Sequence, residues 1–195
     1  IFYKYFNSPI EAYFNPASGG ASTYNFLNAD EANSFGAELE FRKKLDFRPA
    51  LKNFTVQGNL SYIYNRVSGI GLNESRAMQG QSPYLLNMGI QYDLEKYGIN
   101  TTLLFNQIGR RIAFVGGSDQ PPIWENPRPL LDFQIAKKVL KNKGEVKINI
   151  SDIINKEAVF YTDLNANKKY DSNSDAFAIK RKYGTNFSLS FAYNF

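Results

Sequence analysis

The sequence lacks cysteine and histidine altogether, and these absences exclude several kinds of site. Among its 195 residues there is no Cys and no His, so disulfides, thiolate ligands and imidazole ligands for metals are excluded. Serine or cysteine nucleophiles that depend on a histidine are excluded as well. No other pair of nucleophile and base is evident. We therefore expect neither enzymatic activity nor a cofactor.

Long hydrophobic runs and concentrated positive charge are also missing. No stretch approaches the roughly 18 consecutive apolar residues of a membrane helix, and the mean hydropathy is −0.40. These two observations exclude a helical membrane protein. The net charge is +5, but the 23 Lys and Arg residues are scattered along the chain. This scatter argues against nucleic acid as a partner, because nucleic-acid-binding proteins collect their basic residues on one surface.

What the sequence does have is apolar residues at every second position. Hydrophobic residues make up 43% of the chain and aromatic residues 15%. In residues 34–45, for example, Leu39 and Phe41 alternate with Glu38 and Glu40. The same period of two, which is that of a strand, predicts eight strands in total: residues 1–14, 34–45, 54–65, 84–93, 98–107, 130–139, 145–151 and 183–195. The sequence thus predicts an all-β chain folded as an antiparallel, up-and-down meander.

The connections between these strands alternate between long and short. The long ones are rich in Asn, Ser, Gly and Asp and cover residues 15–33, 68–81, 113–127 and 156–182. The short ones have the composition of hairpin turns and cover residues 46–53, 94–98 and 141–144. The meander should therefore have a long-loop end and a short-turn end. Together with strands of about ten residues that have one apolar face, this asymmetry is typical of an outer-membrane β-barrel.

A soluble β-sandwich shows the same alternation, but the positions of the aromatic residues favour the barrel. Tyr62, Tyr64 and Tyr84 fall near the long-loop ends of their strands. Aromatic residues near the short-turn end are Tyr92, Tyr97, Tyr193 and Phe195. Two such girdles flank the apolar band of membrane barrels. Leu39, Leu60, Leu86, Leu103 and Phe133 are then expected to face outer-membrane lipid. Glu40, Asn59, Gln91, Asn106 and Gln134 are expected to face the lumen.

The last strand has large apolar side chains at alternating positions up to the final residue. They are Phe187, Leu189, Phe191, Tyr193 and Phe195. This ending resembles the C-terminal strand by which the barrel-assembly machinery recognises outer-membrane proteins. The simpler alternative is that these side chains only face lipid, and the two roles are compatible.

Several longer stretches resemble the C-terminal barrel of TonB-dependent outer-membrane receptors, and they occur in the order found in that family. The most specific are "QGQSPYLLN" (79–87) and "LDFQIAKK" (131–138) followed by "KINISDIIN" (147–155). The resemblance implies a 22-stranded barrel, in the outer membrane of a Gram-negative bacterium, that is filled by a plug. It also implies TonB-driven import of a scarce metal chelate, vitamin or oligosaccharide.

Residues 1–195 would then be the last eight strands of such a receptor, with the plug and the earlier strands absent from this chain. The partners expected from the resemblance are the rest of the receptor, lipid, the barrel-assembly machinery, and TonB through the plug. The alternative is a self-contained eight-stranded barrel that serves as an anchor or adhesin. The interior of so small a barrel is filled by side chains, whereas the inner positions here include Gly36, Thr55, Ser61, Gly89 and Thr102, which would leave gaps.

Two loop segments are candidate sites. Asp163, Asn165, Asn167 and Asp171 occupy the first, third, fifth and ninth positions of a calcium loop, which lacks the Gly and Glu normally found at positions six and twelve. A polar loop with turn-forming Asn and Asp is the alternative. The other candidates are Arg110, Arg111 and Trp124, which we expect to contact a substrate or partner. The two arginines could attract an anionic chelate or a lipopolysaccharide phosphate, or serve only as an interfacial basic pair.

Overall fold

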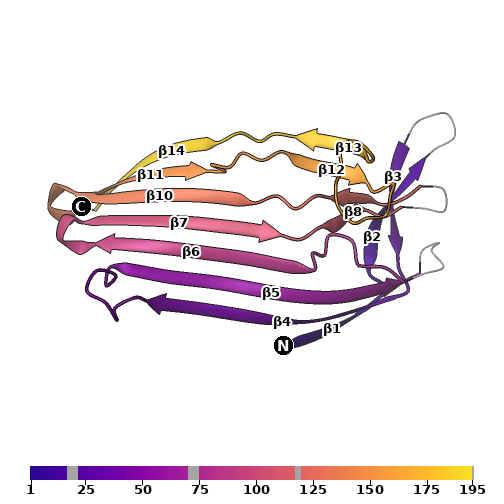
Figure 1. Ribbon diagram of the computed structural model, residues 1–195, viewed down its shortest axis with the longest axis horizontal. Helices are drawn as coiled ribbons and strands as arrows, with labels where there is room; N and C mark the ends of the chain where they lie inside the picture. The colour runs from indigo at the N-terminus through magenta and orange to yellow at the C-terminus, as the bar shows by residue number, and fades with distance from the viewer. Residues whose placement is uncertain (17–21, 70–74, 117–119, 195) are drawn as a thin grey trace.

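The computed structural model describes residues 1–16, 22–69, 75–116 and 120–194, and strands dominate it (Figure 1). None of these residues forms a helix long and apolar enough to cross a membrane. The largest sheet contains eight antiparallel strands in the order β1-β4-β5-β6-β7-β10-β11-β14. Their bounds are β1 (Phe2–Asn7), β4 (Glu31–Lys44), β5 (Phe54–Ser68), β6 (Tyr84–Leu94), β7 (Ile99–Ile108), β10 (Leu130–Val139), β11 (Gly144–Ser151) and β14 (Asn186–Tyr193). The predicted eight-stranded meander is confirmed.

The turns at the short-turn end, on the left in Figure 1, are as compact as the sequence predicts. The 3₁₀ turn η1 (Glu95–Tyr97) joins β6 to β7 and ends at Gly98, whose φ is 61°. Because a positive φ of this kind carries no steric cost for glycine, Gly98 can reverse the chain within a few residues. The 3₁₀ turn η2 (Leu140–Asn142) makes the corresponding connection between β10 and β11.

The long loops, in contrast, contain strands that the sequence analysis missed. The bounds of these strands are β2 (Ile10–Pro16), β3 (Ser22–Asn28), β8 (Arg111–Phe114), β9 (Ile123–Glu125), β12 (Ala158–Thr162) and β13 (Ala176–Arg181). The prediction of one strand over residues 1–14 was wrong, because the chain turns at Ser8 (φ 51°) and Pro9 between β1 and β2. The regular part of the closing strand is also shorter than predicted, since it begins at Asn186, after Gly184 with φ 85°.

Four of these additional strands continue the wall of the main sheet at the long-loop end. They form a second sheet, the cap sheet, in the order β13-β12-β9-β8. Along the chain these strands adjoin β14, β11, β10 and β7, respectively, so the two sheets share one strand order. Between them lies a break, made of residues 109–110, 126–129, 152–157 and 182–185. Pro127 and Pro129 help to end the ladder there, because proline has no N–H group to donate.

Side chains bridge this break where the backbone ladder stops. The guanidinium of Arg128 donates to the Asp152 carboxylate at 2.6 Å, and the backbone N–H of Asp152 donates to the Asp132 carboxylate at 2.8 Å. Further along, the Gly184 N–H donates to Asn155 Oδ1 at 3.2 Å. The backbone groups freed by the break are thus bound partly by carboxylate and amide side chains.

The eight-stranded sheet has one apolar and one polar face. Apolar side chains lie side by side in rows across the strands, and one row consists of Ile90, Leu103, Phe133, Ile150 and Phe187. The neighbouring row on the other face consists of Gln91, Thr102, Gln134, Asn149 and Ser188. Leu39 is 62% exposed and Leu60 48%. An apolar face with such exposure must be covered by something other than this chain.

Aromatic residues mark both edges of the apolar face. Tyr62 and Tyr84 lie directly opposite each other near the long-loop end. Near the short-turn end the rings of Phe54 and Tyr92 lie 4.7 Å apart. The small buried core, in which Ala29, Ala32 and Val67 pack together, lies beyond the first of these levels. The apolar band is thus bounded on both sides by rings, as the sequence predicts.

Candidate binding site at the long-loop end

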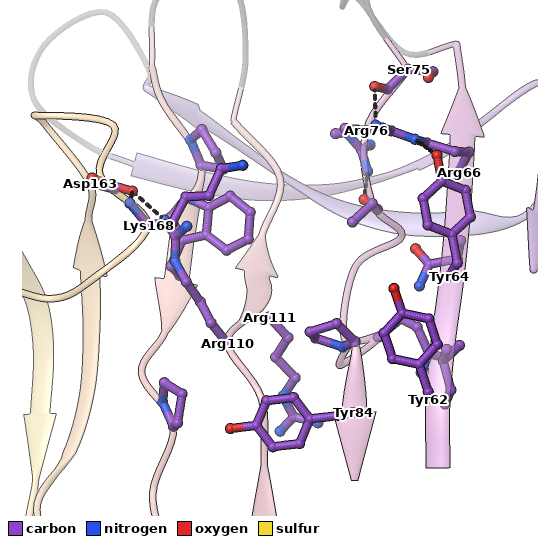
Figure 2. A pocket seen from close by; sticks show the side chains of 18 of the residues that line it. Tyr62, Tyr64, Arg66, Ser75, Arg76, Tyr84, Arg110, Arg111, Asp163 and Lys168 are labelled. Atoms are coloured by element: carbon purple, nitrogen blue, oxygen red, sulfur yellow. Dashed lines mark hydrogen bonds and ion pairs between the residues drawn. The ribbon is translucent and has the colours of Figure 1, made fainter. Parts of the chain in front are cut away.

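A cavity of about 840 Å³ lies between the end of β5 and the cap sheet. Figure 2 shows Tyr62, Tyr64 and Arg66 on one side of it and Arg110 with Asp163 on the other. The charged residues that line it are Arg66, Arg76, Arg110, Arg111, Asp163 and Lys168. The aromatic residues that line it are Tyr62, Tyr64, Tyr84 and Trp124. Cations and aromatic rings thus meet at one place on the wall.

The cavity exists because residues 75–83, here called the displaced segment, leave the plane of the sheet before β6 begins. Arg76 pairs with Val67 of β5, and the carbonyl of Pro83 accepts from the N–H of Ile63. Between these two points the chain turns away, because the N–H of Met78 donates to the side chain of Asn65 at 2.6 Å. Asn65 is buried. The displaced segment leaves a gap between β5 and β8, and this gap is the cavity.

A largely buried ion pair holds the displaced segment against β2. Arg76 donates through both terminal nitrogens to the carboxylate of Glu11 on β2, and Glu11 is only 4% exposed. The same carboxylate accepts from the N–H of Gln79 at 2.8 Å. The side chain of Gln79 accepts from the N–H of Ala12 at 2.6 Å and donates to the carbonyl of Ala113 at 2.7 Å. Polar contacts therefore connect β2, the displaced segment and β8.

Replacing Glu11 by Ala in the complete protein is expected to loosen this connection strongly. Arg76, whose side chain is 13% exposed, would lose its carboxylate in a largely buried position, and breaking a buried pair costs about 3–5 kcal/mol. Hydrogen exchange of the backbone amides in β2 and in residues 75–83 should rise by about a hundredfold or more, since each 1.4 kcal/mol is a factor of about ten. Glu157→Ala, at an exposed position, is the control. If both variants exchange like the wild type, the ion pair does not hold the segment.

The opposite wall of the cavity is organised around Arg110. Its guanidinium lies 3.6 Å from the ring centroid of Trp124 and 5.5 Å from that of Tyr161, and it donates to the Asp163 carboxylate at 2.7 Å. Tyr161, in the cap sheet, is fully buried. Burial raises the pKa of the Tyr161 hydroxyl, against the opposing effect of Arg110. The phenol therefore remains neutral beside the cation, and the stacked rings hold Arg110 in place.

Positive charge exceeds negative charge around the cavity. Five lining residues are cationic, and three of them are paired with acids: Arg76 with Glu11, Arg110 with Asp163 and Arg111 with Glu125. The other two are Arg66 and Lys168. Arg66 donates to the hydroxyl of Tyr64 at 2.8 Å and to the carbonyl of Ser75 at 3.1 Å. Within residues 1–16, 22–69, 75–116 and 120–194, neither of these two cations forms an ion pair with an acid. The site therefore carries an excess of two positive charges.

The structure thus brings together the three loop residues that the sequence analysis selected, Arg110, Arg111 and Trp124. It adds residues that the sequence analysis missed, above all Arg66, Arg76 and Lys168. A signal for one of them was present, because Arg66 continues the alternation of Tyr62 and Tyr64 on one face of β5. Arg76 and Lys168 come from loops, and nothing in their local sequence indicates that they approach Arg110.

The predicted calcium loop is folded by its own side chains. The Asp163 carboxylate accepts from the backbone N–H groups of Asn167 and Lys168 as well as from Arg110. Asn165 and Asp171 accept from backbone N–H groups two residues further on, as in turns of the Asx type. The part of the chain that the structure describes contains no cluster of three acidic side chains placed to hold a metal. Calcium stays a prediction, and it would compete with these hydrogen bonds.

The closing strand places its alternating side chains on the apolar face. Phe187, Leu189, Phe191 and Tyr193 are all exposed there, Phe187 and Leu189 by 73% each. Phe195 lies outside the described residues. Recognition of this strand by the barrel-assembly machinery stays a prediction.

Residues 1–193 match the model of the outer membrane protein beta-barrel family. The chain belongs to this family. A comparison with curated protein sequences gave no match. Among solved structures, the copper transporter OprC is similar, with a TM-score of 0.62, 14% identity, and coverage of 96% of this chain and 27% of that one. The outer membrane transporter YddB from Escherichia coli has a TM-score of 0.56, 10% identity, and coverage of 99% and 29%.

Membership of the outer membrane protein beta-barrel family explains what covers the apolar face, namely the lipid of the membrane. The chain lies in the outer membrane of a Gram-negative bacterium, its apolar face contacts lipid, and it is a barrel protein rather than an enzyme. The two transporters share its fold, and the chain spans less than a third of the length of either. The predicted fold class and location are confirmed.

Proposed function

We propose that this chain forms the closing eight strands of a larger TonB-dependent transporter that imports a scarce solute across the outer membrane. The observation that carries the proposal is the pair of coverages: nearly all of this chain aligns with little more than a quarter of each of two outer-membrane transporters. A piece that fits a transporter in this way is a segment of barrel wall. The plug, the remaining strands and TonB would be its partners, and the long-loop end would face the cell exterior.

The pairing of the outermost strands supports a barrel with more than eight strands. Strands β1 and β14 lie at opposite edges of the sheet, and among the described residues they do not pair with each other. An eight-stranded barrel closes only if its first and last strands pair. Moreover, β1 contacts only the half of β4 from Glu31 to Gly36, so the other half is available to a further strand. These features disfavour the anchor or adhesin.

The polar face supports the role of a transporter wall. Its side chains hydrogen-bond across neighbouring strands, as Asn106 does to Asn87 and Asn149 does to Ser188. Asp93 accepts from both Gln91 and Asn100. Such a wall is polar, and part of its hydrogen-bonding capacity is already used within the chain. It suits a lumen that a plug or a hydrated solute occupies.

A comparison of three bacterial strains tests the proposal: the wild type, a strain that lacks the complete protein and a strain that lacks TonB. Mass spectrometry of spent medium should show the same solute left behind by a strain that lacks the complete protein and by a strain that lacks TonB. The complete protein should migrate in outer-membrane fractions as a heat-modifiable species much heavier than the 22.2 kDa of this chain. Uptake that is lost without the protein but unaffected by loss of TonB would contradict TonB dependence. A heat-modifiable monomer of the chain's own mass would favour the eight-stranded barrel.

A further inference from the structure

We propose that the cavity at the long-loop end binds the phosphate group of an outer-leaflet glycolipid. The inference does not depend on transport, because the cavity opens on the face of the wall opposite to the lumen. It assigns a lipid ligand to the cations and rings described above.

The alternation of β5 shows on which face the cavity opens. Leu60, Tyr62 and Tyr64 are exposed by 48%, 62% and 40%, whereas the intervening Ser61 is buried. Side chains two residues apart on a strand share a face, so Tyr62, Tyr64 and Arg66 continue the face on which Leu60 contacts lipid. All three line the cavity together with Ile63 and Asn65 of the other face. On that other face Asn65 is buried and accepts from the N–H of Met78, so the displaced segment closes the cavity there. A ligand in it therefore approaches from the membrane side of the wall.

The position of the cavity along the strand matches the headgroup layer. Tyr62 and Tyr84 lie opposite each other at the level where aromatic rings mark the boundary of the hydrocarbon. Arg66 lies four residues further along β5, which is about 13 Å at roughly 3.3 Å per residue and less along the membrane normal once the strand is tilted. The cationic part of the cavity thus lies just beyond the hydrocarbon, and its tyrosines lie at the boundary.

The chemistry of the lining favours a phosphate over a neutral or zwitterionic group. The cavity carries the two unpaired cations, Arg66 and Lys168, and a dianionic phosphate would offset both. Arg76 and Arg110 also line the cavity, and their guanidinium groups add to the positive field that a phosphate would meet although each is paired with an acid. Guanidinium groups bind phosphate oxygens through several hydrogen bonds at once. The tyrosine rings supply apolar surface for the sugar that carries the phosphate.

A soluble anion on its way to the lumen would use the same donors, but it fits the position less well. It would have to leave the aqueous path and enter from the lipid side, whereas a lipid phosphate is always present there. A glycolipid also brings acyl chains to the apolar face below Tyr62. The structure therefore favours the lipid as the source of the phosphate.

The experiment uses the complete protein purified in mild detergent. Binding of bisphosphorylated lipid A is measured by native mass spectrometry, for the wild type and for R66Q/K168Q. The matched control is R48Q/K52Q, which removes one Arg and one Lys from exposed positions in the turn between β4 and β5 at the short-turn end. R66Q/K168Q is expected to weaken binding about tenfold, and the control should bind like the wild type. Dephosphorylated lipid should bind poorly to all three proteins.

Several outcomes would overturn the proposal. Equal binding by wild type and R66Q/K168Q would show that the cavity is not the site, and equal loss in R48Q/K52Q would show a non-specific effect of charge. Displacement of the lipid by millimolar inorganic phosphate would assign the cavity to a free anion. Solute uptake by cells should be the same for R66Q/K168Q and the wild type, so a failure of this proposal can be distinguished from a failure of the transport proposal.

Discussion

Deleting Tyr193, Asn194 and Phe195 from the complete protein is expected to reduce the amount of assembled protein in the outer membrane by about tenfold or more, since each unsatisfied backbone group at the membrane boundary costs several kcal/mol. Tyr193 lies opposite Gly144 at the end of the β11–β14 ladder. The N–H of Asn194 donates to the carbonyl of Lys143 at 2.8 Å. The deletion therefore removes pairing at the short-turn end, together with two of the five alternating apolar side chains proposed for recognition.

The measurement is the heat-modifiable fraction of the protein on gels of outer-membrane preparations. Asn194→Ser is the matched control, because it keeps the backbone donor and both apolar side chains. Assembly should fail before transport does, so the truncated protein should be scarce rather than present and inactive. Normal amounts of folded truncated protein would show that this ending is only lipid-facing surface.

Replacing Met88 by Arg is expected to destabilise the complete barrel by about 2–4 kcal/mol, the cost of a cation at the middle of the lipid-facing band. Met88 is 37% exposed on the apolar face. It lies between Gly58 and Phe105 of the neighbouring strands, roughly midway between the Tyr62–Tyr84 level and the Phe54–Tyr92 level. The measurement is the free energy of unfolding by denaturant in lipid vesicles.

Asn59→Arg is the matched control for this experiment. Asn59 follows Gly58 along β5, so it lies at nearly the same height but on the polar face, where Glu40 is its direct neighbour. An arginine there stays in the lumen beside a carboxylate and should cost little. If Asn59→Arg were the destabilising change and Met88→Arg were tolerated, the assignment of the two faces would be reversed, because a shift of one residue exchanges the faces of a strand.

The sequence was sufficient to predict the main sheet because its pattern is local. In β5, Leu60 alternates with Asn59 and Ser61, and a period of two can be satisfied only by a strand with one apolar face. The pairing order then follows from short turns such as η1, because two strands joined by so few residues can pair only with each other at that turn. The aromatic residues at the two edges of the apolar face could be predicted for the same reason. The position of such a residue within its strand determines how far it lies from either end of the sheet.

The strands of the long loops could not be predicted because nothing local specifies them. Strand β9 has only three residues and comes soon after two prolines, and it is a strand because β8 and β12 pair with it on either side. The hairpin of β2 and β3 is attached to β8 through Gln79, which comes from a different loop. Interactions of this kind link segments that are tens of residues apart.

The candidate site was predictable only in part for the same physical reason. Arg110, Arg111 and Trp124 stood out from their composition in a loop, but the acids that pair with two of the cavity's arginines come from distant segments. Glu11 lies 65 residues from Arg76, and Asp163 lies 53 residues from Arg110. Which cations remain unpaired therefore depends on the complete fold, and the proposal of a phosphate ligand rests on this excess of positive charge.

We expect the break between the eight-stranded sheet and the cap sheet to divide the chain into two cooperative units. Residues 109–110, 126–129, 152–157 and 182–185 belong to no strand, and the backbone hydrogen bonds that they form are isolated ones, such as that from the N–H of Asn126 to the carbonyl of Val159 at 2.9 Å. Opening of the cap sheet need not propagate into the strands that cross the membrane. A substitution or insertion in the cap sheet is consequently expected to leave the register of the membrane-crossing strands unchanged. The exposed surface of the protein can diversify, or be grafted from a relative, while the membrane-spanning wall keeps its assembly and its stability.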